Sequence, residues 1–244
     1  MKPRNNPPIG RKAVQRIDFI KEFCRGKRVL HLGCTNWPYT QESIKNGMLL
    51  HSDLAEVSRE VHGFDVDPKG IAELTRLGYR NLYEVDLERL DGVEIDEPFD
   101  VVVAGEMIEH LNNPGLFLDG IRKFIHPETR LLLTTINAYC GMRFFIYGLR
   151  GKKGVNEPVH PDHVAYYSYS TLNLLLDRHG FDVDEFHFYD IGREHRPFNR
   201  KIYNLVNDLF VLLSPQLSDG IIAVCRRSDA ADTDNSEFVQ DTDS

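Results

Sequence analysis

The 244-residue sequence has few cysteines and no long apolar segment, and these shortages exclude several classes of protein. Its four cysteines are far apart and form no Cys-x-x-Cys pair, which argues against a disulfide framework and a zinc ribbon: Cys24, Cys34, Cys140 and Cys225. No apolar run approaches the roughly 20 residues that cross a bilayer. The polar, proline-rich start also lacks the apolar core of a signal peptide. We therefore expect a cytoplasmic protein without a membrane partner.

The sequence has little charge imbalance outside its last residues. The formal net charge is −8, but residues 228–244 hold six acidic residues and no basic one, which leaves −2 for residues 1–227. A nearly neutral domain lacks the basic surface that nucleic-acid-binding proteins typically carry. Because residues 228–244 also lack the apolar side chains that folding requires, we expect one domain at 1–227, followed by a disordered acidic tail.

Short apolar segments alternate with segments of helical spacing through most of the chain. The predicted strands are 27–33, 61–67, 81–87, 99–105, 129–137, 181–190 and 219–227, and the predicted helices are 49–61, 68–78, 114–125, 170–180 and 199–213. Strands that alternate with helices form a mostly parallel sheet, because the connecting helices cover its faces. The pattern predicts an α/β, Rossmann-like, doubly wound fold with a mostly parallel seven-stranded sheet and helices on both faces.

The residues at the carboxyl ends of these strands are the first candidates for a binding site, because ligands of such sheets bind there. Gly33 ends the first strand, where the missing side chain lets a ligand approach the backbone. Asp65 and Asp86 follow the second and third strands, and their carboxylates can accept hydrogen bonds from a ribose diol or an adenine amino group. Each acid alone is an ordinary turn residue. Together with Gly33 they indicate a nucleoside-type cofactor.

Four segments resemble, in order and content, the motifs of class I S-adenosylmethionine-dependent methyltransferases: VLHLGC (29–34), VHGFDVD (61–67), YEVDLERL (83–90) and FDVVVAGEMIEHL (99–111). The resemblance implies S-adenosylmethionine as the cofactor. It implies that Gly33 and Cys34 border the methionine part, that Asp65 holds the ribose and that Asp86 lies by the adenine. The full set of implied cofactor-binding residues is Gly33, Cys34, Asp65, Val66, Asp86, Leu87 and Gly105.

The first loop departs from the Gly-x-Gly-x-Gly pattern of that family. It reads Gly33-Cys34-Thr35-Asn36-Trp37, so only the first glycine is kept, and Thr35 and Trp37 narrow the space near the amino-acid end of the cofactor. Asn36 tolerates left-handed backbone geometry, so a tight turn can still form. The loop does not match the GxGxxG of a nicotinamide dehydrogenase. A relative that kept the fold as a binding protein and lost catalysis stays open.

The segment Gly105–His110, GEMIEH, places two glutamates and a histidine just after a buried strand. If a helix starts there, Glu106, Glu109 and His110 share one face and point into one cleft. Acids also suit the first turn of a helix because of its dipole, but that does not explain the histidine. His51 lies in a different segment, 37–53, and is expected to be solvated or to cap a helix.

The ExxEH…H arrangement resembles ubiquinone-type O-methyltransferases and small-RNA 3′-end 2′-O-methyltransferases. It implies a divalent cation, Mg²⁺ or Mn²⁺, held by Glu106, Glu109, His110 and His163, with His160 as the alternative to His163. Glu109, His110 and His163 are also the implied catalytic residues. A histidine that acts as a general base without a metal, and a purely structural role, are the other interpretations. The histidines 160 and 163 fall in an irregular stretch, about 138–169, which we expect to form a lid or substrate-binding insertion.

The expected acceptor is a hydroxyl group of a glycan or a small metabolite. Tyr166, Tyr167 and Tyr169 could stack on a sugar ring or pack at the edge of the core. RNA is the alternative acceptor and needs a basic, aromatic surface. The basic candidates for it, Arg143 with residues 150–154 and residues 192–201, are modest clusters in a nearly neutral domain, so nucleic acid is not the favoured partner.

Overall fold

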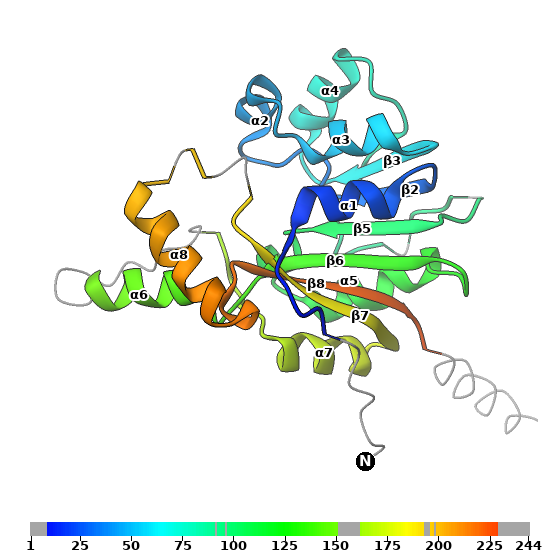
Figure 1. Ribbon diagram of the computed structural model, residues 1–244. Helices are drawn as coiled ribbons and strands as arrows, with labels where there is room; N and C mark the ends of the chain where they lie inside the picture. Colours follow the sequence, from blue (N-terminus) through cyan, green and yellow to red (C-terminus); the bar gives the residue numbers. More distant parts are fainter. Residues whose placement is uncertain are drawn as a thin grey trace, which may run out of the picture.

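The computed structural model describes residues 9–90, 92–95, 97–150, 162–192, 196–197 and 199–228. Within these residues one sheet of eight strands forms the centre of the molecule, in the order β1-β7-β8-β6-β5-β2-β3-β4 (Figure 1). The strands are β1 (Val14–Gln15), β2 (Arg28–Leu32), β3 (Glu60–Asp65), β4 (Leu82–Glu84), β5 (Val101–Gly105), β6 (Arg130–Ile136), β7 (Phe181–Asp190) and β8 (Gly220–Arg227). All neighbours are parallel except β8, which is antiparallel to β6 and β7.

The predicted fold class is confirmed, and the two-residue β1 adds an eighth strand beside β7. The helices are α1 (Arg16–Cys24), α2 (Thr40–Asn46), α3 (Leu50–Val57), α4 (Pro68–Arg76), α5 (Pro114–Ile121), α6 (Gly141–Arg150), α7 (Tyr169–Arg178) and α8 (Lys201–Leu213). Three short 3₁₀ turns are η1 (Ile108–His110), η2 (Arg122–Phe124) and η3 (Pro215–Leu217) within the described residues. The sequence patterns did not predict α1 and α6.

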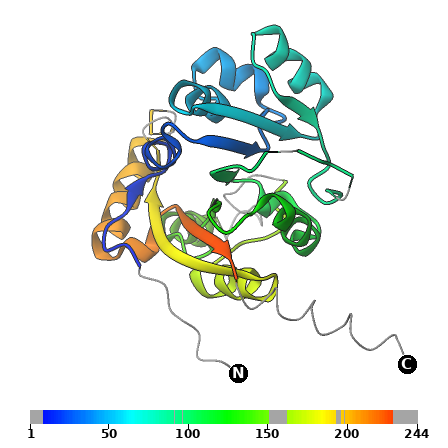
Figure 2. The ribbon, with the colours of Figure 1, turned by 90° about the vertical axis from the view of Figure 1, so that its right-hand side faces the viewer.

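Helices cover both faces of the curved sheet, as Figure 2 shows. Side chains alternate between the two faces of a strand, so neighbouring residues of β5 belong to different apolar clusters. Val103 belongs to the cluster that contains Ile20 of α1 and Leu54 of α3. Val102 belongs to the cluster that contains Phe117 of α5 and the buried leucines of α7. This two-sided burial explains why the strands read as continuous apolar runs.

Some expected features lie outside the described residues. These are residues 229–244, which make up nearly all of the expected acidic tail, and His160. The expected lid at 138–169 is described in part, as α6 and the loop from 162 onward. Across the described parts of the chain, no helix has both the length and the apolar character that crossing a membrane requires.

His31 of β2 and His51 of α3 form a buried pair. Their Nδ1 atoms lie 3.2 Å apart, so one Nδ1–H donates a hydrogen bond and the other Nδ1 accepts it, and their rings stack with centroids 5.5 Å apart. Burial lowers the pKa of His51 to about 4 and the pKa of His31 well below its usual value, and His51 and Arg16 lower the pKa of His31 further. The expectation that His51 is solvated or caps a helix was wrong, because its side chain is fully buried against the sheet.

We expect this pair to make the protein less stable in acid. Both folded-state pKa values lie below the unfolded value of about 6.5, so the unfolded chain binds protons more tightly. The contribution of the neutral pair is complete above pH of about 6.5 and is lost as the pH falls towards 4. In His51→Asn the amide can replace Nδ1 as a partner but does not titrate. Over this pH range the variant should lose about 3 kcal/mol less unfolding free energy than the wild type, measured by urea unfolding.

The exposed His126 provides the control for this comparison. His126→Asn should follow the wild-type stability profile, because this exposed side chain takes no part in the buried pair. Parallel loss of stability in His51→Asn and the wild type would show that the buried pair is not the cause.

Candidate cofactor cleft and metal cluster

A cleft of about 750 Å³ opens at the carboxyl ends of β2 and β5. These two strands lie side by side where the order of the sheet reverses, which is where ligands of doubly wound sheets bind. Gly33 and Gly105, which end or follow the two strands, line the cleft, as do Cys34 and Trp37 of the first loop. Its other walls come from α1, from α2 and the segment that leads to α3, and from the turn that follows β5.

The first loop makes a tight turn without the second glycine of the family pattern. Gly33 has a φ of 73°, a conformation that favours glycine, and its N–H donates to the carbonyl of Phe64 at 2.9 Å. Asn36 has a φ of 59°, and its amide donates to the hydroxyl of Ser43 at 2.6 Å. The prediction that Asn36 can adopt left-handed geometry is confirmed, so the loop bends by means of one glycine and one asparagine.

The carboxylate of Asp65 connects this loop to β3. Its Oδ2 accepts a hydrogen bond from the N–H of Thr35 at 2.9 Å, and its Oδ1 accepts one from the N–H of Asp67 at 3.0 Å. The side chain is buried and does not line the cleft. Of the predicted cofactor-binding residues, the cleft is lined by Gly33, Cys34 and Gly105, and not by Asp65, Val66, Asp86 and Leu87.

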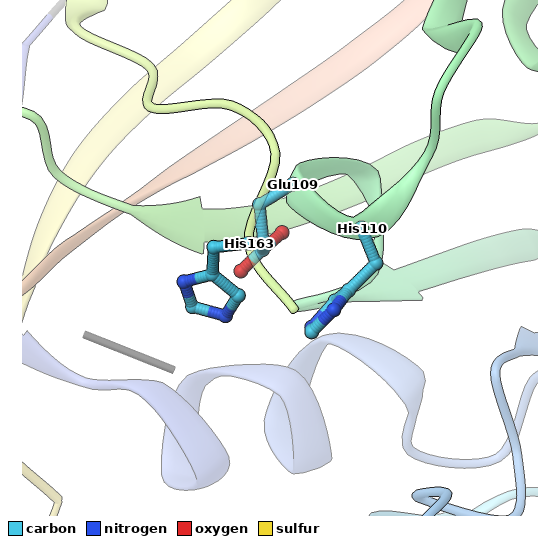
Figure 3. Close-up of side chains that lie close together, drawn as sticks. All are labelled: Glu109, His110 and His163. Carbon is cyan, nitrogen blue, oxygen red and sulfur yellow. The ribbon is translucent and has the colours of Figure 1, made fainter. Parts of the chain in front are cut away.

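Three predicted residues lie together in the wall of the cleft. Glu109, His110 and His163 each offer a ligand atom, and these atoms lie within 4.8 Å of one another. Figure 3 shows the carboxylate and the two imidazoles close together, with Glu109 and His110 on the η1 turn and His163 on a separate loop. Among the residues that the structure describes, this is the group whose geometry could hold a metal ion.

Main-chain hydrogen bonds bring His163 to this turn. The N–H groups of Val164 and Ala165 donate to the carbonyl oxygen of Glu109 at 2.9 and 3.3 Å. The rings of His110 and His163 then meet edge to face, with centroids 4.6 Å apart. The distant histidine is therefore placed by the backbone of its own loop, which the sequence spacing alone does not specify.

Glu109 has a fully buried carboxyl group, and only one of its two oxygens has a hydrogen-bond partner. Its Oε2 accepts a hydrogen bond from the hydroxyl of Thr135 at 2.9 Å, whereas its buried Oε1 has no hydrogen-bond partner. Burial, followed by the nearby charge of Glu106, raises the pKa of Glu109 to about 8. A buried oxygen without a partner costs free energy, and a cation in the cleft would remove that cost.

Glu106 lies apart from this cluster. Tyr189 donates its hydroxyl to one carboxylate oxygen at 2.5 Å, and the Arg16 guanidinium lies 3.2 Å from the other. Gly220 lies opposite Tyr189 in the sheet, and a Cβ there would overlap the tyrosine ring. The condition for a shared face, an α-helix that starts just after β5, is not met: η1 is a single 3₁₀ turn that begins at Ile108 and does not include Glu106.

Sequence reasoning missed Arg16 and Tyr189 as residues of this site. Tyr189 is one residue from the end of a predicted strand, so its place at the carboxyl edge of the sheet was a usable signal. Arg16 begins a helix that the apolar pattern did not predict, so no comparable signal existed for it.

Two of the described basic residues that were considered for RNA binding, Arg143 and Arg196, are paired with acids. Arg143 is mostly buried, and its guanidinium lies 2.6 Å from the carboxylate of Asp219. Arg196 lies 2.7 Å from both Asp190 and Asp208. A guanidinium held by carboxylates has less positive potential to offer a phosphate backbone, so these two residues do not favour the RNA alternative.

The chain matches known proteins over most of its length. The family model described as "Methyltransferase domain" covers residues 10–185. The ubiquinone biosynthesis O-methyltransferase of Dechloromonas aromatica (strain RCB) is 31% identical over 207 residues, which are 80% of this chain and 81% of that protein. The protein of the same name from Proteus mirabilis (strain HI4320) is 29% identical over 137 residues, 53% of this chain, and the match spans about half of its length (51%).

A solved structure supports the same fold. The magnesium protoporphyrin IX methyltransferase of Synechocystis PCC 6803 with bound SAH superposes with a TM-score of 0.55 and 15% identity, over 87% of this chain and 82% of that one. At this identity the likeness concerns the fold alone. The family match agrees with the cleft at the reversal of the strand order and with the glycine that follows β2. The chain belongs to the methyltransferase-domain family, as a class I S-adenosylmethionine-dependent methyltransferase.

Proposed function

We propose that the protein is an O-methyltransferase that acts on a hydroxyl group of a glycan or a small metabolite, assisted by a divalent cation. The observation that carries this proposal is the cluster of Glu109, His110 and His163 in the wall of the cleft that Gly33 also lines. The relatives named for O-methylation in ubiquinone biosynthesis support transfer to oxygen and a small-molecule acceptor.

The cleft suits the cofactor of the family. Its volume of about 750 Å³ lies in the usual range for small-molecule sites, and Gly33 and Gly105 keep the ends of β2 and β5 open. S-adenosylmethionine supplies the electrophilic methyl group when bound. We propose that Gly33, Cys34 and Gly105 border its methionine part. Asp65 and Val66 for the ribose, and Asp86 and Leu87 for the adenine, complete the proposed set. They lie at or just after the carboxyl ends of β3 and β4, outside the lining of the cleft.

The residues of the cluster also suit a divalent cation. One carboxylate and two imidazoles fit Mn²⁺, Mg²⁺ or a related divalent ion better than a metal that seeks thiolates, and the partnerless Oε1 of Glu109 is a ligand atom that a positive charge would stabilise. A bound cation lowers the pKa of a hydroxyl that it contacts and fixes its orientation. Because the pKa of Glu109 is about 8, cation binding should release a proton from this carboxyl group at neutral pH. Glu106 would have to leave Tyr189 and Arg16 to join as a fourth ligand.

The segment 138–169 is the proposed acceptor lid of a single domain at 1–227. Its described loop is connected to β6 by the N–H of Ala138, which donates to the carbonyl of Tyr167 at 2.8 Å. Tyr167 is buried, and Tyr169 packs edge to face on Phe186 in the core. Tyr166 is the one of the three tyrosines whose exposure suits contact with a sugar ring.

Binding of S-adenosylmethionine should change the fluorescence of Trp37, because the chain's one tryptophan lines the cleft and is 62% exposed.

Gly33→Ala should weaken binding of S-adenosylmethionine at least about tenfold, since a methyl group there narrows the approach to the backbone. Gly26 has a φ of 68°, close to that of Gly33, and a Cβ there would meet no atom within 4 Å. Gly26→Ala therefore adds the same backbone strain and should leave the affinity unchanged. Calorimetric titration with S-adenosylmethionine measures the affinity of both variants. If the wild type itself gives no heat of binding, the cofactor assignment is wrong.

Glu109→Gln should weaken binding of Mn²⁺ by about 100-fold or more, because the amide offers no charge to the cation. The affinity for S-adenosylmethionine should stay as in the wild type. Glu56→Gln changes an exposed glutamate on α3 outside the cluster and serves as the matched control. Titration with Mn²⁺ alone, followed by its electron paramagnetic resonance signal, needs no acceptor. Equal Mn²⁺ affinity in Glu109→Gln and the wild type would contradict the proposed ligand set.

The same enzyme preparations test the reaction itself. Methyl transfer from labelled S-adenosylmethionine to a panel of sugars and small vicinal diols should depend on added Mn²⁺ or Mg²⁺ and stop with chelator. Turnover that continues unchanged in chelator would favour a histidine acting as a general base instead.

A further inference from the structure

Helix α8 exposes a continuous apolar stripe to solvent. Along it, apolar residues follow one another at three- and four-residue spacing and lie 54% to 83% exposed: Ile202, Leu205, Leu209, Leu212 and Leu213. In a globular domain the apolar stripe of a helix normally faces the core. Here the one fully buried residue of α8 is Asn207, on the side away from the stripe. The helix thus presents its most apolar side outward.

Helix α6 lies beside α8 and extends this apolar surface. A Cβ at Gly141 would meet the ring of Phe210, so the two helices are in close contact at the start of α6. Helix α6 exposes four large apolar or aromatic side chains: Phe144, Phe145, Tyr147 and Leu149. Figure 1 shows both helices projecting beyond the same end of the sheet. We call these exposed side chains of the two helices the α6–α8 face. Single exposed apolar residues are ordinary, but so many on two neighbouring helices are typical of an interaction surface.

Basic residues flank the α6–α8 face although the chain as a whole is acidic, with a net charge of −8. Arg200 and Lys201 are exposed at the start of α8. Helix α6 contains no acid. The one acid of α8, Asp208, is ion-paired with Arg196 at 2.7 Å. The face therefore combines exposed apolar side chains with positive charge at the start of α8.

We propose that the α6–α8 face docks on the surface of an anionic membrane. Apolar stripes that carry Lys and Arg at their edges bind the boundary between headgroups and acyl chains, where both the buried apolar area and the charge contribute. With thirteen residues, α8 is shorter than the roughly 20 that span a bilayer, so it would lie in the plane of the surface. The absence of a spanning run led us to expect no membrane partner, but docking on a surface requires only a stripe.

Charge favours this occupant over a second copy of the chain. A symmetric dimer through the α6–α8 face would bring two identical basic margins together, and like charges across an interface oppose association. An anionic lipid surface instead offers opposite charge to the same residues. The end of the sheet that carries the cleft also carries α6, which starts soon after β6 ends, so docking would hold that end of the molecule at the membrane.

Sedimentation with vesicles tests the proposal. The full chain should sediment with vesicles of phosphatidylcholine and phosphatidylglycerol and at least about tenfold less with vesicles of phosphatidylcholine alone. Leu209→Ser/Leu212→Ser should reduce binding to the anionic vesicles at least about tenfold, because it removes apolar area from the stripe. Arg200→Gln/Lys201→Gln should weaken binding most at low salt. Thermal unfolding of each variant checks that the fold is kept, which we expect because these side chains are exposed.

Matched controls lie elsewhere on the surface. Leu77→Ser/Leu116→Ser removes two exposed leucines, one just after α4 and one on α5, and Lys69→Gln/Arg80→Gln removes two exposed charges. Both variants should bind vesicles as the wild type does. Failure of the wild type to sediment with anionic vesicles, or equal sedimentation of the stripe variant, would overturn the proposal. So would a wild-type dimer in light scattering that becomes a monomer in Leu209→Ser/Leu212→Ser without any vesicle binding. None of these outcomes depends on methyl transfer.

Discussion

The left-handed backbone at Glu106 is the constraint on which the arrangement of the site depends. A non-glycine residue in this conformation costs of order 1–3 kcal/mol, so the surrounding structure must hold it. The carbonyl oxygen of Thr134 accepts a hydrogen bond from the main-chain N–H of Glu106. The Tyr189 hydroxyl donates to the carboxylate of Glu106, and Arg16 forms an ion pair with it. This sharp turn at the end of β5 lets η1 begin three residues later, and η1 presents Glu109 to the cleft. Residues from β6, β7 and α1 thus position a ligand cluster to which none of them contributes a side chain.

The fold could be predicted from the sequence because its signals are local. Strands buried on both faces read as short apolar runs, and a helix between two of them requires a parallel crossover. The turn after β2 could be predicted for the same reason, since the left-handed conformations at Gly33 and Asn36 are preferences of those residues themselves. The cluster of Glu109, His110 and His163 could also be predicted. Glu109 and His110 share one motif, and a resemblance linked that motif to His163.

The rest of the site depends on contacts between distant segments, which the sequence pattern does not encode. Glu106 lies within a motif that suggests a shared helical face, but Tyr189 and Arg16, remote in the chain, bind its carboxylate. His51 looked like a surface histidine because no local pattern shows that His31 faces it from the sheet. In α8 the apolar spacing predicts a helix but not which side is covered, because apolar residues occur on more than one side.

The loop that carries His163 is held to η1 by main-chain atoms. The N–H groups of Val164 and Ala165 bind one carbonyl oxygen, and such bonds survive most side-chain substitutions, with proline as the exception. The side chains of this loop can therefore diverge during evolution without displacing the imidazole. The molecule in this way separates two kinds of sequence change: those at the turn after β5, which alter the chemistry available in the cleft, and those in the loop, which alter the shape presented to the acceptor.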